Sequence, residues 1–415
     1  MGRGTHVTFR SVFAVREFRA LWAAEALSQA GDQLARVALA ILVFNETRSA
    51  ALTGLTYALT FAPSFLGGIF LSGLADRFPR REVIVVTDVL RALLVALVAI
   101  PGLPFPVAFV LIGLTSFLQA PFKGAQQALL PTVLPGDLYI VGMGIRTITI
   151  QSAHLAGFAG GGILVNALGP YLALAIDAAT FLASALVIRF GVRRRPAATS
   201  GENRRSMTAS VGAGAGHIWR DRGARVLVLF CWLSAFLIVY EGLAAPYVAE
   251  IGGGTVGVGL LLASDPLGSV IGALVWSRFV PAVTRPRLLG AVAVLSALPL
   301  LPCFFAPNFA VSFILFAVAG ALGTALLMQA TAAFTRGLPD EIRAQGAGLM
   351  NSGIATVQGL SPLLAGLLAD QLQSTTRTVG IVGVIGVAIA IPAAFAWRRA
   401  MAADPDRWTL VTDNE

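Results

Sequence analysis

The chain has 415 residues, of which 56% are apolar and 12% are charged, whereas a soluble globular domain is about 45–50% apolar and roughly 25% charged. This composition excludes an ordinary water-soluble globule and predicts a helical membrane protein. In a soluble protein the net charge of +9 would suggest a nucleic-acid partner, but here the basic residues follow the topology derived below, and we expect no nucleic-acid partner.

Twelve apolar stretches follow one another along the chain, and each is long enough to cross a bilayer as a helix. We therefore expect an all-α polytopic membrane protein with twelve transmembrane helices in two six-helix halves. The expected spans are residues 20–44, 52–75, 83–101, 106–130, 139–166, 170–189, 226–249, 256–279, 287–305, 308–334, 344–369 and 378–397. The expected parts are a cytoplasmic N-terminal segment (1–19), the first half (20–189), a cytoplasmic linker (190–225), the second half (226–397) and a cytoplasmic tail (398–415).

The basic residues predict the orientation, because Lys and Arg gather in the cytoplasmic loops of membrane proteins. Of the 30 basic residues, only Arg48 and Arg377 fall in loops on the side opposite the termini. Apart from four within spans, the others lie in the termini and in the loops on the same side. We expect a multi-pass protein of the cell membrane with both termini in the cytoplasm and with a first span that is retained rather than cleaved.

The two halves should be related by an internal repeat. At an offset of 204 residues, Leu134-Pro135 corresponds to Leu338-Pro339, Gly142 to Gly346 and Gly144 to Gly348. Two parallel six-helix halves are the arrangement found in large transporters with a site between the repeats.

The first span carries one polar stripe. Glu25, Gln29, Asp32 and Arg36 are spaced so that they lie within about 60° of one another around a helix. Facing lipid, such a stripe would be prohibitively costly, so it must face protein or a water-filled cavity. Either Asp32 and Arg36 form an ion pair that neutralises itself, or the stripe lines a site in which Arg36 tunes the acid.

The loop after the second span reads Ser72-Gly73-Leu74-Ala75-Asp76-Arg77-Phe78-Pro79-Arg80-Arg81. It resembles the G-x-L-A-D-R-x-G-R-R loop of the major facilitator superfamily and departs from it at Ser72 and Pro79. The resemblance implies a latch of the cytoplasmic gate formed by Asp76, Arg77, Arg80 and Arg81. An acid can face a helix N-terminus while arginines bind carbonyl ends or anionic lipid; a plain basic loop would need only the arginines.

The third to sixth spans hold several further polar residues. Asp88 and Arg91, three residues apart in the third span, and Asp177 in the sixth are expected to form structural pairs, because the resemblance makes these two spans outer supports. Lys123 and Arg146 lie near the cytoplasmic ends of their spans, where they can reach the interface. Gln151 and His154 in the fifth span could line the cavity, although a lone membrane histidine is more often a hydrogen-bonded structural residue.

The fifth span ends in Gly157-Phe158-Ala159-Gly160-Gly161-Gly162, where small residues permit close helix approach. This run is similar to a degenerate G-P-x-x-G-G pattern of exporters in the superfamily. With Asp88-Val89-Leu90-Arg91, Ala128-Leu129-Leu130-Pro131 and Ile176-Asp177-Ala178, it resembles the branch that contains enterobactin and macrolide exporters.

The second half offers two intramembrane acids. Glu241 has no basic residue within one turn, which makes it the candidate proton carrier. Asp265 precedes Pro266 at an expected helix break, where it could instead bond backbone groups freed by the proline. Together with Asp32, these acids are the expected proton-coupling residues. Glu241 also joins Glu25, Gln29, Asp32, Arg36, Gln151 and His154 as expected lining of the substrate cavity.

No nucleotide-binding loop, zinc-protease motif or nucleophile elbow occurs in the sequence. Cys231 and Cys303 both lie in apolar runs, which leaves no disulfide framework or metal-site spacing. We expect no enzyme activity, no cofactor and no metal, a monomer as the functional form, and small-molecule substrate, protons and membrane lipid as the partners. The expected function is proton-coupled efflux of a small hydrophobic or amphipathic organic compound by alternating access. Uptake symport or uniport is the main alternative, and a membrane-embedded enzyme or sensor would need clustered catalytic residues that the sequence does not offer.

Overall fold

A computed structural model describes residues 8–71, 74–196, 216 and 218–408. Among these residues, ten helices are long and apolar enough to cross a membrane. Many of their large apolar side chains point outward, as in Leu93, Val110, Ile163 and Leu186. Outward apolar side chains on long helices suit contact with lipid, since a helix satisfies its own backbone hydrogen bonds. The prediction of an all-helical membrane fold is confirmed.

The chain divides into two compact units, Met1–Leu42 with Leu59–Glu202, and Val43–Ala58 with Asn203–Glu415. We call them unit 1 and unit 2. The helices of unit 1 are α1 (Phe9–Ala14), most of α2 (Arg16–Thr47), α4 (Ala62–Leu71), α5 (Leu74–Arg77), α6 (Arg80–Val98), α7 (Phe105–Phe117), α8 (Gln119–Val133), α9 (Asp137–Leu168) and α10 (Pro170–Gly191).

Unit 2 contains the end of α2 and nearly all of α3 (Ala50–Leu59). Its other elements are α12 (Arg222–Leu237), α13 (Val239–Gly242), α14 (Ala244–Glu250), α15 (Thr255–Phe279), α16 (Arg285–Ala297), the 3-10 helix η1 (Leu298–Phe305), α17 (Phe309–Gly337), α18 (Asp340–Leu372), α19 (Thr375–Ala403) and α20 (Pro405–Trp408).

Two of the expected spans differ from the ten long apolar helices. The stretch 52–75 is divided into α3 and α4, and Pro63 lies in the first turn of α4. Proline is tolerated in a first turn but not in a helix interior, which explains why a new helix starts here. The stretch 83–101 forms the single helix α6, but its charged residues, including Asp88 and Arg91, make it less apolar than the others.

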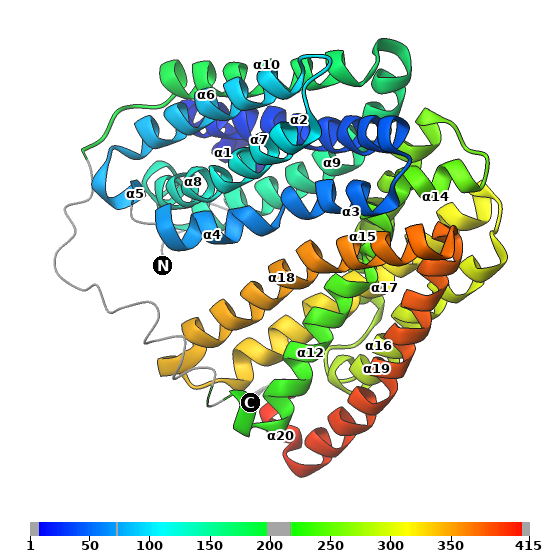
Figure 1. Cartoon of the computed structure of the whole chain (residues 1–415). Coiled ribbons are helices and arrows are strands. Elements are labelled where there is room, and N and C mark those ends of the chain that lie inside the picture. The colour runs from blue at the N-terminus through cyan, green and yellow to red at the C-terminus, as the bar shows by residue number, and fades with distance from the viewer. Residues whose placement is uncertain (1–7, 72–73, 197–215, 217, 409–415) are drawn as a thin grey trace, which may run out of the picture. The chain divides into compact units, whose positions relative to one another are not determined.

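The internal repeat appears in both packing and backbone conformation. In unit 1, α6 packs along α10, and in unit 2, α16 and η1 pack along α19 (Figure 1). Three pairs of residues with positive φ are each separated by 204 positions: Arg48 (52°) and Gly252 (78°), Gly102 (82°) and Ala306 (46°), and Gly169 (81°) and Gln373 (50°). Each pair contains one glycine, the residue that adopts this conformation without steric cost. The two halves therefore turn their chains in the same way at the same places.

Two carboxylates cap helices within unit 2. Asp370 at the end of α18 accepts hydrogen bonds from the backbone amides of Ala50 (2.7 Å) and Ala51 (3.1 Å) at the start of α3. Glu250 accepts hydrogen bonds from the amide of Thr376 (3.0 Å) and the hydroxyl of Ser374 (2.7 Å) at the start of α19. Burial acts to raise the pKa of Glu250, but these hydrogen bonds outweigh it and hold the pKa below its usual value. Negative charge at a helix N-terminus is stabilising, so both contacts fix the ends of helices.

The last described turn covers the start of unit 2's first long helix. The indole of Trp408 is buried, and a Cβ atom added at Gly223 or Gly337 would come within 2.5 or 2.2 Å of its ring. Arg407 pairs with Asp221 (2.5 Å) and donates to the carbonyl of Gly337 (2.8 Å). Because Gly223 and Gly337 have no Cβ atom, they leave the slot that the indole of Trp408 fills.

Candidate functional site

The polar stripe on α2 is divided between two partners in unit 1. At its N-terminal end, Glu25 is buried and accepts a hydrogen bond from Nε of Arg146 on α9 (2.6 Å). Arg146 also donates to Oε1 of Gln126 on α8 (3.1 Å). This ion pair is satisfied by groups from three helices, which is the condition under which a buried pair is tolerated.

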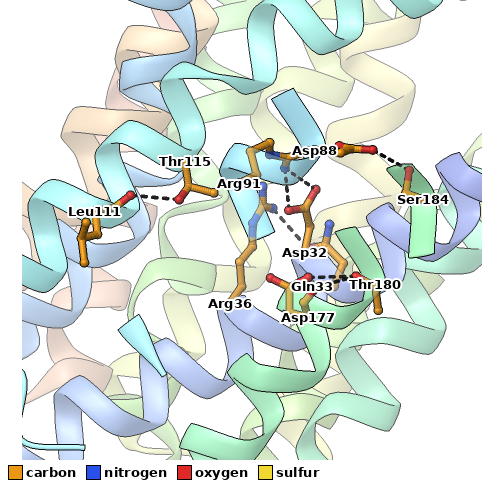
Figure 2. A network of polar contacts seen from close by, with 10 residues as sticks. All are labelled: Asp32, Gln33, Arg36, Asp88, Arg91, Leu111, Thr115, Asp177, Thr180 and Ser184. Atoms are coloured by element: carbon orange, nitrogen blue, oxygen red, sulfur yellow. Dashed lines mark hydrogen bonds and ion pairs between the residues drawn. The ribbon is translucent and has the colours of Figure 1, made fainter. Parts of the chain in front are cut away.

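Asp32 pairs with Arg91 on α6. Nη2 of Arg91 lies 2.9 Å from Oδ1 and 3.3 Å from Oδ2 of Asp32 (Figure 2). The guanidinium of Arg91 lies 4.0 Å from the ring centroid of Phe181 and 5.6 Å from that of Phe122. Because these rings hold Arg91 by cation–π contact, it is fixed beside Asp32.

The interpretation of Asp32 and Arg36 as a self-neutralising pair is therefore wrong. Nη1 of Arg36 donates to Oε1 of Gln33 (3.2 Å), and its guanidinium lies 4.3 Å from the ring centroid of Phe61. Arg91 comes from another helix, and spacing within a single helix could not reveal it.

Arg91 also serves a second carboxylate. Its Nη1 lies 3.7 Å from Oδ1 of Asp88, and Oδ2 of Asp88 accepts a hydrogen bond from Ser184 on α10 (2.6 Å) (Figure 2). The expected pairing of Asp88 with Arg91 is present, but it is part of a network with Asp32 rather than an isolated surface pair. Asp88 and Arg91 are almost completely buried.

Asp177 on α10 lies at the other edge of this network. Its Oδ1 accepts a hydrogen bond from the hydroxyl of Thr180 (3.2 Å). A Cβ atom added at Gly31 of α2 would lie 2.3 Å from Oδ1 of Asp177 and 2.2 Å from Oγ1 of Thr180. Because Gly31 has no Cβ atom, Asp177 and Thr180 of α10 can reach the backbone of α2. A glycine next to Asp32 was the feature of the sequence that could have indicated this close contact between helices.

A small pocket opens onto the network. The space in it that is open to water is about 50 Å³, and its lining is mostly apolar but includes Asp32, Arg36, Arg91 and Asp177. These charged groups offer the polar partners that a water molecule needs, and about 15 Å³ is enough to hold one. The pocket can therefore hold water beside the carboxyl groups, but it is too small for an organic substrate.

Unit 2 holds two further acids in its helices, of which Glu241 is buried and Asp265 is half-buried. Glu241 on α13 accepts a hydrogen bond from the hydroxyl of Tyr57 on α3. Asp265 on α15 accepts one from the hydroxyl of Tyr240 (2.6 Å), and both Tyr240 and Asp265 line a second pocket with about 50 Å³ open to water. A phenol can donate to a carboxylate without neutralising it.

The expected helix break at Asp265 and Pro266 is wrong, because α15 continues through Pro266. The neighbouring α17 explains why. A Cβ atom added at Gly320 would lie 2.6 Å from the carbonyl oxygen of Asp265, which shows that α17 lies directly against α15 at this point. A helix supported in this way can contain a proline.

The remaining expected cavity residues lie on the same helices. Gln29 on α2 and Gln151 and His154 on α9 are each partly buried. His154 lies within electrostatic range of Arg36, Asp32 and Lys123. The structure therefore brings the basic and acidic groups of α2, α8 and α9 into one environment within unit 1.

Two arginines of the loop motif donate hydrogen bonds to carbonyl groups near helix ends. Nη1 of Arg80 donates to the carbonyl of Ala128 near the end of α8 (2.7 Å), and Nη1 of Arg81 donates to the carbonyl of Val192 after α10 (3.3 Å). Arg77 is exposed. The side chain of Asp76 and the residues Ser72 and Gly73 lie outside the described residues.

Long apolar helices, an internal repeat and carboxyl groups within the helical bundle are typical of a polytopic membrane protein of the transporter class. The sequence matches the Major Facilitator Superfamily over residues 21–245 and 241–409. The chain belongs to this family. It is therefore a multi-pass membrane protein and a secondary transporter of small molecules, not an enzyme.

The chain is also similar to individual members. The uncharacterized MFS-type transporter YkuC of Bacillus subtilis (strain 168) is 26% identical over 184 residues, which are 43% of this chain and 42% of that protein. The match thus spans less than half the length of this relative.

Solved structures are similar over nearly the whole chain. A bacterial homolog to the human lysosomal transporter Spinster has a TM-score of 0.73 at 15% identity, covering 95% of this chain and 99% of that one. The nucleoside transporter NupG has a TM-score of 0.69 at 14% identity, covering 92% and 99%. At these identities the similarity shows the fold alone.

Proposed function

We propose that the protein is a proton-coupled exporter of a small hydrophobic or amphipathic organic compound, with Glu241, Asp32 and Asp265 as the proton-coupling residues. The observation that carries the proposal is that carboxyl groups line pockets of about 50 Å³ open to water in both units, Asp32 and Asp177 in unit 1 and Asp265 in unit 2. An acid that is dry in one conformation and wet in another changes its proton affinity between them. That difference couples proton movement to a conformational equilibrium.

The energetics allow a single titrating acid. One proton crossing about 100 mV supplies about 2.3 kcal/mol, which sustains roughly a 50-fold gradient of a neutral compound. The polar groups of the substrate cavity would come from four partly buried side chains and from the buried Glu25. The four are Gln29, Arg36, Gln151 and His154.

Efflux is favoured over uptake by the glycine run of α9 and by the resemblance to the enterobactin and macrolide exporter branch. Within unit 1, this run brings α9 against α2: a Cβ atom added at Gly157 would lie 2.7 Å from Cβ of Gln33, and one at Gly161 would lie 3.2 Å from Cγ2 of Val37. A close helix contact of this kind suits a helix that bends or slides during transport.

The loop motif would latch the cytoplasmic gate. The bonds of Arg80 and Arg81 to the carbonyl groups of Ala128 and Val192 tie the loop to the ends of α8 and α10. Asp76 is the remaining member of this proposed latch.

The test is transport into inside-out vesicles with an imposed pH gradient, using a panel of organic cations, neutral drugs and organic acids. Glu241→Gln should abolish pH-driven transport but preserve substrate binding and downhill exchange. Asp32→Asn should weaken substrate binding at least tenfold, because it removes the partner that orders Arg91. The control is Glu46→Gln, the same change at an exposed position.

If Glu241→Gln concentrates substrate with unchanged pH dependence, Glu241 is not the carrier. If wild-type vesicles show pH-driven release instead of accumulation, the protein is an uptake transporter and the proposed direction is wrong.

A further inference from the structure

Three carboxyl groups surround a single guanidinium in unit 1. Asp32 and Asp88 both contact Arg91 within 4.0 Å. Asp177 lines the same pocket as Asp32 and Arg91. In the described part of the chain, Asp177 has no basic nitrogen within 4.0 Å of its carboxyl group, and Thr180 is its hydrogen-bond donor.

Arg36 is the other cation that lines this pocket. It is held by Gln33 and Phe61 rather than by a carboxylate. If all three carboxyl groups were ionised, three anions would share Arg91, the cation that lies within ion-pair distance of Asp32 and Asp88 in the described residues. A like charge nearby disfavours ionisation, and one bound proton relieves this repulsion.

Geometry shows which carboxyl group should hold that proton. Asp32 faces Nη2 of Arg91 through both oxygens, and Asp88 has Arg91 and Ser184. Asp177 is 99% buried and is bonded to a neutral hydroxyl. The buried carboxyl group with the least charge compensation is the one that stays protonated.

The network can also rearrange. Nε of Arg91 and Oδ1 of Asp88 are buried and have no hydrogen-bond partner in the described structure. Arg91 therefore has a donor to offer to another carboxylate. Lys123 on α8 interacts with Asp32, Arg36 and Arg91, and His154 on α9 interacts with Arg36, Asp32 and Lys123. The charged groups that act most strongly on Asp177 are Asp32, Arg91 and Asp88.

We propose that Asp177 is a proton-binding residue of the transport cycle, with Arg91 as the counter-ion that it shares with Asp32. While Asp32 is paired with Arg91, Asp177 holds the proton. When Asp32 accepts that proton through the pocket water, its bond to Arg91 weakens and the ionised Asp177 becomes the partner of Arg91. One O–H bond breaks and one forms, so the net charge of the network does not change.

The role in the cycle depends on the proposed proton-coupled function, but proton binding by Asp177 can be measured without a substrate. The measurement is infrared spectroscopy of the purified full-length protein at pH 7. Asp177→Asn should lack a carbonyl stretching band of a protonated carboxyl group that the wild type shows. In the wild type this band should shift to lower frequency in D₂O. The matched control is Asp137→Asn, an exposed aspartate in the first turn of α9, which should remove a carboxylate band instead.

Asp32→Asn provides the test of the shared counter-ion. Without Asp32, Arg91 becomes available to Asp177, and the protonated band of Asp177 should disappear although the residue is still present. A difference spectrum in which Asp177→Asn removes a carboxylate band would overturn the proposal. If Asp177→Asn does not fold, Asp177→Ser and the D₂O shift of the wild type give the same information.

The transport cycle supplies the second readout. Asp177→Asn should reduce pH-driven transport at least tenfold and leave downhill exchange within twofold of wild type. Wild-type pH dependence in this variant would show that Asp177 binds a proton outside the cycle and would overturn its assigned role. If instead the wild type shows no pH-driven flux of any compound, proton-coupled transport fails as a function, whereas the infrared result still decides the protonation of Asp177.

Discussion

Glu25 and Arg146 illustrate what a single buried pair contributes in this protein. Both side chains are at most one tenth exposed, and removing one partner leaves the other as an uncompensated buried charge. We expect Glu25→Gln to lower the free energy of unfolding by about 3–5 kcal/mol, measured by thermal or denaturant unfolding of the purified protein.

Glu82 provides the matched comparison for Glu25. It pairs with Arg81 at 2.8 Å but its side chain is 32% exposed, and exposed pairs contribute about 0–1 kcal/mol. The free energy of unfolding of Glu82→Gln should therefore be close to that of the wild type. Equal losses in the two variants would show that burial does not decide the contribution.

The sequence predicted individual residues of the site better than their partners. Asp32 was predicted from its place in the stripe of α2, and it lies in the network. Arg91, Asp88 and Asp177 were interpreted as structural groups of outer helices, because periodicity orders residues around one helix and says nothing about which neighbour they face. The roles predicted for Asp32, Glu241 and Asp265 remain predictions.

At the scale of helices, the glycine run of α9 separates two kinds of glycine. A Cβ atom at Gly157 would lie 2.8 Å from the carbonyl oxygen of Ala30, whereas one at Gly160 would meet nothing within 4 Å. Gly157→Ala should force α9 away from α2 and lower both the unfolding temperature and the transport rate.

Gly160→Ala is the control in the same helix. Alanine in a helix interior is more favourable than glycine by about 1 kcal/mol, so this variant should unfold at or above the wild-type temperature. Loss of stability in both variants would mean that helix contact is not the cause.

The turn after η1 carries strain that its repeat partner avoids. Ala306 has φ of 46°, and Gly102 holds the corresponding place in the first half. The left-handed conformation costs a non-glycine residue roughly 1–2 kcal/mol, partly offset by the greater freedom of glycine in the unfolded chain. We expect Ala306→Gly to raise the free energy of unfolding by up to about 1 kcal/mol.

At Ala388, an exposed residue inside α19, we expect the same substitution to change stability in the opposite direction. Ala388→Gly should lower the free energy of unfolding by about 1 kcal/mol, since glycine is a poor helix former. Chemical unfolding of the two variants measures both changes. A loss at Ala306 would indicate that its side chain is needed for packing rather than strained.

The prediction of helix positions from apolar length was accurate where apolar runs were unbroken, as for α9 and α10. The prediction was less accurate for residues 52–75, where a new helix starts near Pro63. It was also less accurate at Pro266, because α15 continues through this proline. Whether a proline ends a helix depends on the helix packed beside it, and that information is not local in the sequence.

At the scale of the whole molecule, topology is the prediction that the distribution of basic residues makes. Cys231 and Cys303 are buried, so an introduced cysteine can be labelled selectively. A membrane-impermeant maleimide should label Arg377→Cys on intact cells. It should label Gly201→Cys and Asp413→Cys only in inside-out vesicles; both of these positions lie outside the described residues. Labelling of either from outside the cell would contradict the twelve-span arrangement.

The internal repeat was predictable at this scale, because short motifs of the two halves align in the sequence at an offset of 204 residues. The same offset relates the turns at Gly169 and Gln373. Conversely, the division of the chain into units that separates Val43–Ala58 from its neighbours had no sequence signal, since it depends on contacts between distant helices.

The slot for Trp408 has a consequence for biosynthesis. Gly223, at the start of α12, receives its cover from a residue translated roughly 185 positions later. At about 5–20 residues per second, the ribosome needs on the order of 10–40 s to supply it. During that interval the start of α12 lacks the cover that Trp408 gives it in the folded protein.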